Sequence, residues 1–526
     1  MEKKSFFEYI ELDGVRLFTA VMLPSSKGKF PVTVIRCPYV DWLENWAEKD
    51  ICDLYEKENE AWLKRGYAVV YQHCRGRGKS DGDCIPYINE GKDTNALYDW
   101  IREQSFYNGE LYLRGGSYLT SVHYCAAPYG TDIKGAVFAI QDSERYNICY
   151  RNGVLKKKLH TDWYVGMYKA KSKTKKNYDA DSLDMLPLKN FSKSVFGESV
   201  PDLDKMLASP RLSAPFWQTH EGGSDARGAT DNVDFPILLT TGFYDIYTGG
   251  VFDMWRSMSK KTRENSALVV SPYDHGDRYN EGINVALSFP KGRRDEEFGL
   301  DYEIDWFDSI RNGTEPNFKK GLVTYYRLFE NKWATDSFDC QNEIKIPLGD
   351  KTVAYAYNPQ NPPRFKGGLC CNFGGAMLQD KPYLRDDIIT VYTDKFSEDV
   401  FVKGRIKATL KVSSDCLDTC FCMRISIEKE QGDFGLRDDI TTLCHQLKDY
   451  TPNTYVNLDF VFDEHAFLIK KGERLRIDIA SADAENYVRH TNTKGLYSEQ
   501  TETRIARNTV DLAKSVLSVP LEKYTQ

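Results

Sequence analysis

Short, uninterrupted apolar stretches that alternate with helical patterns are the feature of this sequence that most restricts its fold. Val32–Arg36, Tyr67–Tyr71 and Gly135–Ile140 are rich in β-branched and aromatic residues, as is usual for strands buried on both faces. Helical patterns lie over Leu54–Lys64 and from about Asp93 to Gln104. Strands separated by helices form βαβ units, so this part of the chain predicts a mostly parallel sheet covered by helices.

The same pattern returns after an interruption. Residues 145–228 are rich in Lys and Tyr and are typical of helices and loops, whereas buried-strand patterns resume at Phe235–Thr240 and Ala267–Val270. We therefore expect one α/β domain, made of residues 1–144 and 229–333. The intervening helical segment is expected to form a lid over the C-terminal edge of the sheet.

After about Trp333 the pattern changes to short, alternating β-rich segments with few helices between them. The clearest segments are Ile389–Tyr392, Val402–Val412, Phe421–Ile427 and Arg474–Ala480. This pattern predicts an antiparallel sandwich or jelly roll over residues 334–526. A chain of 526 residues is long enough for two to four domains at about 150 residues each.

Charge and hydropathy exclude several classes of protein. The formal net charge is −7, whereas a nucleic-acid binder is usually basic. No apolar run approaches the roughly 18 residues that span a bilayer, and the N-terminus becomes acidic at Glu8, too early for a signal-peptide core. We expect a cytoplasmic protein with neither a nucleic-acid nor a membrane partner, and leave homo-oligomerisation open.

The cysteine pattern argues against a disulfide scaffold. The 13 Cys are an odd number and are scattered along a long chain, so most are expected to be reduced thiols. Cys416, Cys420 and Cys422 form a cluster, but they lie in a strand-like stretch without a paired CxxC motif or a nearby His. Buried strand cysteines are therefore expected there instead of a metal site, and no cofactor is predicted.

A candidate nucleophile lies where the strand pattern at Leu111–Leu113 runs into the small residues before Ser117. A serine on a sharp strand-to-helix turn projects its Oγ above the sheet edge, and its neighbours must carry little side chain. The backbone N–H of Tyr118 would then point toward a developing oxyanion. Leu119 stands where the G-x-S-x-G pattern has its last glycine, so a tight turn with an ordinary capping serine is the alternative.

A nucleophilic serine needs an acid and a base, which follow it in that order in an α/β hydrolase, each on a loop after a sheet strand. Among the eight His, only His275 meets both conditions, because it follows the strand Ala267–Val270. Asp245 follows the preceding strand, Phe235–Leu239, and its carboxylate would orient the imidazole. Asp274 is a local rival, but it adjoins the histidine and is expected to cap the loop.

A second oxyanion donor is expected at the end of a neighbouring strand. Tyr39 follows Arg36-Cys37-Pro38, and its hydroxyl could donate the second hydrogen bond, with Pro38 stiffening the approach. From these residues alone, a packed core tyrosine is the default interpretation.

Taken together, these segments resemble the cocaine esterase and Xaa-Pro dipeptidyl-peptidase-like serine hydrolases (the CocE/NonD family), a branch that includes the α-amino-acid ester hydrolases and glutaryl-cephalosporin acylases. The resemblance covers nearly the whole chain apart from the lid. The segments that carry it are Asp13–Leu17, Arg36–Tyr39, Arg75–Gly82, Glu90–Asp93, Asp99–Ile101, Asn108–Gly109, Gly115–Tyr118, Gly242–Asp245, Pro272–His275, Ser413–Asp415 and Lys471–Ile477.

The resemblance implies an α/β-hydrolase fold with a C-terminal jelly roll, and hydrolysis of an ester or amide bond through a covalent acyl-enzyme. It also implies a set of site residues. These are Ser117 as nucleophile, His275 as base, Asp245 as acid, and the Tyr39 hydroxyl and the Tyr118 N–H as oxyanion donors.

The sequence departs from the family pattern at two places. Thr120 stands where glycine is usual and could crowd the packing behind the turn. His73-Cys74 replace an acidic and a small residue before the segment Arg75–Gly82, here called the RGRG loop. Both argue against assigning a substrate by analogy. The arginines of this loop are expected to bind carboxylates of the fold. A phosphate-binding P-loop is not expected, because Gly78-Lys79-Ser80 lacks the upstream glycines of that motif.

Other functions stay open. An X-Pro dipeptidyl-peptidase or an α-amino-acid ester hydrolase would need an acidic pocket for the substrate's ammonium group, for which Asp142, Glu144 and Asp162 are candidates. A catalytically silent protein that binds carbohydrate through its jelly roll is a further alternative. The expected substrate is a small-molecule ester or amide. Four lid aromatics either line its pocket or simply pack the lid: Trp163, Tyr164, Tyr168 and Trp217.

Overall fold

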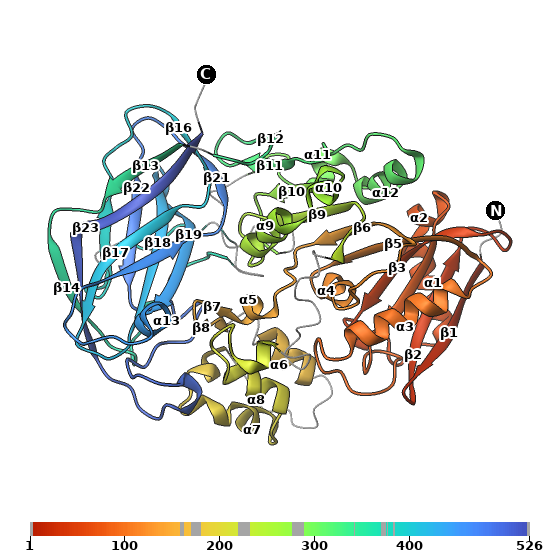
Figure 1. Ribbon diagram of the computed structural model, residues 1–526, viewed down its shortest axis with the longest axis horizontal. Coiled ribbons are helices and arrows are strands. Elements are labelled where there is room, and N and C mark those ends of the chain that lie inside the picture. The colour runs from red at the N-terminus through yellow and green to blue at the C-terminus, as the bar shows by residue number, and fades with distance from the viewer. Residues whose placement is uncertain are drawn as a thin grey trace.

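The computed structural model has three parts, which Figure 1 shows as a large sheet with its helices, a helical lid and a β-domain. The structure describes residues 4–157, 162–169, 180–218, 232–275, 289–340, 342–369, 375, 377–381 and 384–522. Within these ranges no helix combines the length and the apolar character needed to cross a membrane.

The large sheet has ten strands and is mostly parallel. In sheet order they are β1 (Lys4–Leu12), β2 (Val15–Leu23), β4 (Ala68–His73), β3 (Phe30–Cys37), β5 (Tyr107–Gly116), β6 (Ile133–Ala139), β9 (Ile237–Gly242), β10 (Ala267–Ser271), β11 (Val323–Arg327) and β12 (Lys332–Asp336). The run from β4 to β11 is parallel, whereas β1, β2 and β12 pair antiparallel at the two edges. This arrangement is the predicted α/β class, in which βαβ crossovers cover both faces.

Side chains alternate between the two faces of the sheet along each strand. Both sets are apolar here, so helices cover both faces. On β5, Leu111 and Leu113 pack on one face, and Tyr112 packs on the other. The first face carries α3 (Glu90–Arg102), α4 (Tyr118–Tyr124) and α9 (Thr248–Ser257), and the second carries α1 (Glu48–Glu58), α2 (Glu60–Lys64) and α12 (Tyr302–Asn312). The remaining helices of this part are α10 (Lys260–Glu264) and α11 (Arg294–Phe298).

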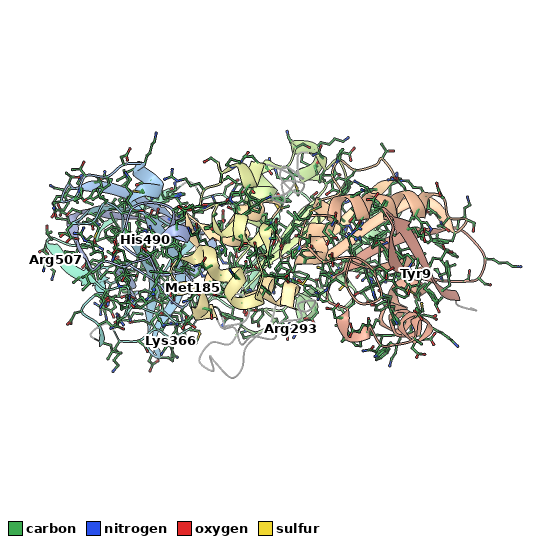
Figure 2. The ribbon with its side chains drawn as sticks, turned by 90° about the horizontal axis from the view of Figure 1, so that it is seen from below. Tyr9, Met185, Arg293, Lys366, His490 and Arg507 are labelled. Carbon is green, nitrogen blue, oxygen red and sulfur yellow. The ribbon has the colours of Figure 1, made fainter. Side chains whose placement is uncertain are left out.

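The lid is the segment between β6 and β9, and it lies between the large sheet and the β-domain (Figure 2). Its elements are α5 (Arg145–Cys149), β7 (Tyr150–Arg151), β8 (Val154–Leu155), α6 (Asp162–Lys169), α7 (Phe191–Phe196) and α8 (Pro201–Leu207), with short 3₁₀ turns at Ala180–Asp184, Leu188–Asn190 and Pro215–Gln218. The lid's limits of 145 and 228 stay predictions, since the described residues stop at 218 and resume at 232.

The β-domain, residues 342–522, is a pair of antiparallel sheets. One sheet holds β13 (Asn342–Pro347), β14 (Thr352–Tyr357), β16 (Val400–Gly404), β17 (Lys407–Ser414), β20 (Val456–Val461), β21 (His465–Ile469) and β23 (Ala506–Glu522). The other holds β15 (Ile389–Tyr392), β18 (Cys420–Lys429), β19 (Gly432–Thr442) and β22 (Leu475–Ala480), and one short helix, α13 (Leu443–Leu447), follows β19.

One predicted strand is divided in the structure. The stretch Val402–Val412 belongs to β16 and β17, because Gly404 has a φ of +117° and ends the first of them. Both pieces pair with β23, and on their other edges β16 pairs with β21 and β17 with β20.

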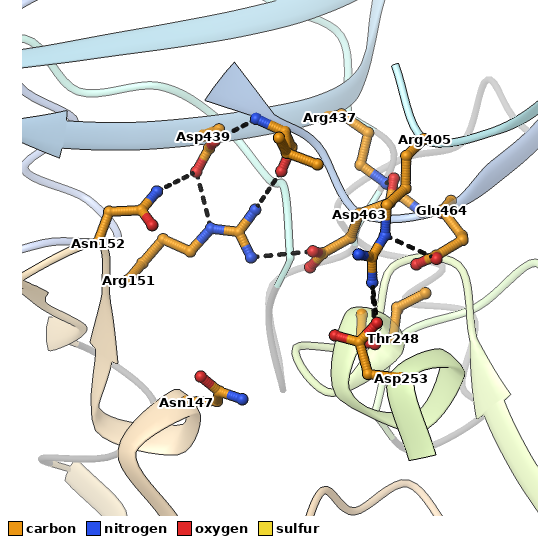
Figure 3. Close-up of polar contacts among 12 residues, drawn as sticks. Asn147, Arg151, Asn152, Thr248, Asp253, Arg405, Arg437, Asp439, Asp463 and Glu464 are labelled. Carbon is orange, nitrogen blue, oxygen red and sulfur yellow. Dashed lines mark hydrogen bonds and ion pairs between the residues drawn. The ribbon is translucent and has the colours of Figure 1, made fainter. Parts of the chain in front are cut away.

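Buried ion pairs join the lid to the β-domain (Figure 3). Arg151 of the β7–β8 hairpin binds two carboxylates: its Nε lies 2.7 Å from Asp439 Oδ1 and its Nη1 lies 2.9 Å from Asp463 Oδ1. Its Nη2 also donates to the carbonyl of Val461. Asp439 is 1% exposed as a side chain, so the charges depend on each other for stabilisation.

The same cluster joins the β-domain to α9. Glu464, which is fully buried, lies 2.5 Å from Nη1 of Arg256 and 2.7 Å from Nε of Arg405. Arg405 reaches back to Asp253 of α9 at 2.6 Å. Burial raises the pKa of Glu464, and the two guanidinium groups oppose that rise. Figure 3 shows Arg405 beside this carboxylate, which would be costly to bury without such partners.

We expect Arg151→Met to lower the free energy of unfolding by about 3–5 kcal/mol, because it leaves two buried carboxylates without their partner. Urea unfolding followed by fluorescence measures the change. Lys92→Met is the matched control, since it removes an ion pair whose side chains are 57% and 55% exposed and should leave the transition midpoint unchanged. Equal effects of the two substitutions would contradict the stabilising role of the cluster.

Candidate active site

Ser117 lies at a strained turn between β5 and α4. The strand ends at Gly116 and the helix begins at Tyr118, and Ser117 between them has φ 57° and ψ −129°. A positive φ is unfavourable for a residue with a side chain, and such strain persists only where the surroundings impose it. The backbone N–H of Ser117 donates to the carbonyl of Ala139 on β6 at 2.9 Å, which holds the turn against the sheet.

Two neighbours make this turn possible. A Cβ atom at Gly115 would lie 2.3 Å from the carbonyl oxygen of Leu119, so the first turn of α4 can approach the strand only over a glycine. Thr120 does not crowd the turn as its place in the family pattern suggests. Its side chain is buried, and its hydroxyl donates to the carbonyl of Gly115 at 2.6 Å.

Ser117, His275 and Asp245 lie within contact of one another. Nε2 of His275 lies 2.8 Å from Oγ of Ser117, and Nδ1 lies 3.3 Å from Oδ1 of Asp245. The carboxylate is fully buried, and the same Oδ1 accepts the backbone N–H of Tyr247 at 2.9 Å. Three residues distant in the sequence thus form one chain of polar atoms at the C-terminal edge of the parallel strands.

The β-domain contacts the residues just before Asp245. The Tyr244 hydroxyl donates to the carbonyl of Gly435 at 3.1 Å and lies 3.4 Å from Nε2 of His465. The ring of Phe243 lies 5.1 Å from the ring of His465. Burial lowers the pKa of His465 well below its usual range, so this histidine is a neutral packing partner. The loop that carries Asp245 is therefore held from the side of the β-domain.

Tyr39 lies just beyond β3 and is 41% exposed. Its hydroxyl accepts a hydrogen bond at 2.9 Å from the indole N–H of Trp163, on lid helix α6. The Trp163 ring lies 5.2 Å from the ring of Tyr118, the residue after Ser117. Nε of Arg77 donates to the carbonyl of Pro38 at 2.6 Å and so fixes the turn before Tyr39. The two residues predicted as oxyanion donors thus meet at one lid tryptophan.

A buried network of hydrogen bonds and ion pairs lies beneath the turn, and it was not predicted from the sequence. The Tyr118 hydroxyl donates to Glu90 at 2.8 Å, and Glu90 pairs with Arg36 of β3 at 2.5 Å. Arg36 also lies 3.6 Å from Asp93, which binds Arg75 at 2.6 Å. The charges link the strand before Tyr39, helix α3 and the first residue of α4.

The RGRG loop uses its arginines as expected from the sequence. Arg75 binds Asp93, and Arg77 lies 3.0 Å from Asp41. Both carboxylates belong to the fold itself. The loop therefore stabilises the edge of the sheet next to Tyr39 through these ion pairs.

The other lid aromatics have different surroundings. Tyr164 is fully buried, and its hydroxyl donates to Asp202 and accepts from Arg145. Trp217 is 1% exposed, and its indole N–H donates to the carbonyl of Ser209. These contacts favour lid packing for both residues. The side chain of Tyr168 lies outside the described residues.

Two of the three acidic candidates for an ammonium site, Asp142 and Glu144, are engaged in the fold. Asp142 accepts the backbone N–H of Glu144 at 2.8 Å and the amide of Asn147 at 3.0 Å. Burial raises its pKa to about 6. Glu144 accepts the N–H of Tyr146 and caps α5. The side chain of Asp162 is not among the described residues.

Comparisons with known proteins agree with this architecture. A family model described as X-Pro dipeptidyl-peptidase (S15 family) matches residues 13–277. One described as X-Pro dipeptidyl-peptidase C-terminal non-catalytic domain matches residues 350–516. A cocaine esterase of Rhodococcus sp. (strain MB1 Bresler) is 23% identical over 547 residues, covering 93% of this chain and 92% of that protein.

Solved structures with low sequence identity share the fold over the whole chain. An aminopeptidase from the marine sediment archaeon Thaumarchaeota archaeon has a TM-score of 0.82 at 17% identity. An α-amino acid ester hydrolase labelled with selenomethionine has a TM-score of 0.82 at 18% identity. In each comparison 99% of this chain and 97% of the other are covered. A CocE/NonD family hydrolase from Staphylococcus aureus reaches 0.68 at 14% identity, covering 99% and 93%.

We expect Gly115→Ala to lower the free energy of unfolding by about 1–3 kcal/mol, because its Cβ would overlap a backbone carbonyl that cannot easily move. Gly116→Ala is the matched control, since the nearest atom would lie 3.8 Å away, and it should be tolerated. Thermal unfolding of both variants measures the difference. Equal melting temperatures would show that the close approach at Gly115 is not a constraint.

Proposed function

The chain belongs to the X-Pro dipeptidyl-peptidase (S15) family and is a serine hydrolase of ester or amide bonds, and we propose that Ser117, His275 and Asp245 form its catalytic triad. The observation that carries this proposal is the contact of His275 with both other residues, at 2.8 and 3.3 Å. It supports proton transfer along a single path, as in other serine hydrolases.

In the proposed reaction Ser117 attacks the carbonyl carbon of the substrate while Nε2 of His275 accepts the hydroxyl proton. The imidazolium then donates that proton to the leaving group, and a covalent acyl-enzyme remains. Water, activated by the same imidazole, attacks the acyl-enzyme and releases the acid. Asp245 holds the ring in the required tautomer and stabilises its positive charge during both steps.

The oxyanion that forms in each step needs donors placed in advance. We propose the backbone N–H of Tyr118, which is the first of helix α4, and the hydroxyl of Tyr39. A phenol that accepts a hydrogen bond from Trp163 still carries its own O–H as a donor. The contact with the lid orients the phenol, and preorganised donors of this kind lower the barrier strongly.

We propose esters as better substrates than dipeptidyl-Pro amides. A dipeptide substrate would bring an ammonium group that needs acidic partners, and Asp142 is buried, with its oxygens accepting two hydrogen bonds from the start of the lid. The α-amino-acid ester hydrolase and dipeptidyl-peptidase activities are the alternatives within the family. A silent carbohydrate-binding protein is the alternative outside it.

A substrate panel with Ser117→Ala tests the function. The unmodified protein should hydrolyse p-nitrophenyl esters with uncharged acyl groups faster than a dipeptidyl-Pro p-nitroanilide, and it should be labelled by a fluorophosphonate probe. Ser117→Ala should lose both turnover and labelling while keeping its melting temperature. Retained turnover in the variant would refute the nucleophile. Absent labelling of the unmodified protein would favour the silent alternative, and faster amide cleavage would favour the peptidase.

Tyr39→Phe tests the proposed second oxyanion donor. We expect kcat for a p-nitrophenyl ester to fall about 100- to 1,000-fold, because one donor to the oxyanion is lost. KM and the melting temperature should change little, since the ring remains in place. Steady-state kinetics at saturating ester measures this. An unchanged kcat would remove Tyr39 from the mechanism.

A further inference from the structure

We propose that the protein has a second small-molecule site, a cavity between the lid and the β-domain that binds a small apolar molecule carrying a carboxylate. The cavity has a volume of about 450 Å³, within the range of pockets that hold ligands. It is lined by the β7–β8 hairpin, the segment after α8, helix α13 and residues around the 3₁₀ turn Tyr497–Glu499. No member of the proposed triad lines it.

The position of the cavity separates it from the proposed active site. Figure 1 places β7, β8 and α13 where the lid meets the β-domain, whereas α4, which follows Ser117, lies against the large sheet. His490, another lining residue, is labelled on the β-domain near the lid in Figure 2. A ligand here would touch two parts of the chain at once.

The walls of the cavity are largely apolar. Leu155, Leu188 and Leu207 of the lid face it together with Val488 of the β-domain, and each of these side chains is at most 4% exposed. Apolar walls of this kind favour an aromatic ring or a branched alkyl group, because burying the ligand removes apolar surface from water.

Within the part of the chain that the structure describes, two guanidinium groups at the cavity have no carboxylate partner. Among the described residues, Arg211 makes its hydrogen bond to the backbone carbonyl of Cys444 at 2.9 Å. Arg489 donates through its two Nη atoms to the backbone carbonyls of Pro359, at 2.8 Å, and Asp184, at 3.0 Å, and to the side-chain oxygen of Gln360 at 3.2 Å. Guanidinium groups are always charged and bind carboxylates through charge-assisted hydrogen bonds, so these two groups favour an anion.

The acidic side chain at the cavity does not neutralise them. Asp418 accepts the backbone N–H of Cys444 at 3.0 Å, and its other oxygen lies 3.5 Å from Nε2 of His490. Both oxygens of this carboxylate therefore contact groups of the β-domain. Lys494 also lines the cavity but pairs with Asp449 at 2.6 Å, so the attraction for an anion comes from Arg211 and Arg489.

Two buried donors at the cavity have no hydrogen-bond partner within the described part of the chain. They are the hydroxyl of Tyr497 and Nε of Arg489. Burial raises the pKa of Tyr497 well above its usual value, so the hydroxyl keeps its proton. A buried donor without a partner is unfavourable, and an acceptor group on a ligand would satisfy it. Apolar walls, unsatisfied donors and two guanidinium groups without a carboxylate partner among the described residues together point to an apolar carboxylate.

Isothermal titration with 2-naphthoate tests the site. We expect saturable binding that is unchanged when Ser117 has been blocked with phenylmethylsulfonyl fluoride. The neutral analogue 2-naphthamide should bind at least ten-fold more weakly. Arg211→Gln combined with Arg489→Gln should weaken naphthoate binding at least ten-fold, whereas Arg16→Gln, which removes a cation from β2, should not. Binding that is lost on blocking Ser117, or that ignores the two arginines, would overturn the proposal.

A second pair of variants tests the location without removing charge. Ala208 lines the cavity and is exposed, so Ala208→Trp should fill the space and abolish binding of 2-naphthoate, while Ala208→Ser should retain it. Melting temperatures show whether both variants are folded. If the tryptophan variant is folded and binds normally, the cavity is not the site. These measurements need no turnover, so they remain interpretable if the proposed hydrolysis is not observed.

Discussion

A buried carboxylate between two guanidinium groups ties the helix after the proposed catalytic acid to the rest of the molecule. Glu464 belongs to the β-domain, and Arg256 belongs to α9, which begins at Thr248, three residues after Asp245. A charge removed from water is tolerated only where opposite charges and hydrogen bonds replace the water. The β-domain must therefore lie close against α9 for these charges to be stable.

The same domain also holds the residues on the other side of Asp245, through the contacts of Tyr244 with Gly435 and His465. A segment that matches a family model described as non-catalytic thus borders the proposed acid from both sides. The contacts from Tyr118 through Glu90 to Arg36 likewise hold the residue that follows the proposed nucleophile. Catalytic geometry requires such support, because small displacements of reacting groups cost much of the rate.

Much of the α/β part was predictable because its strands are continuous apolar runs and its proposed triad follows a fixed order along the chain. Ser117, Asp245 and His275 each follow a recognisable strand, so their convergence follows from the parallel sheet. The ion pair of Glu90 with Arg36 was not predicted, since a glutamate at the start of a helix looks like an ordinary solvated residue. The pairing of Arg151 with Asp463 depends on how domains dock, which local patterns do not encode. The division at Gly404 was missed because apolar and polar residues alternate across it without a break.

β23 has a consequence for how the protein is made. This single strand, Ala506–Glu522, pairs with β13, β14, β16 and β17, so the sheet lacks its shared central member until residues 506–522 leave the ribosome. The α/β part is translated much earlier and can begin to fold as a unit. The loop bearing Asp245 can gain its neighbours from the β-domain only when β23 has joined the sheet, so activity should emerge only after residues 506–522 have been synthesised.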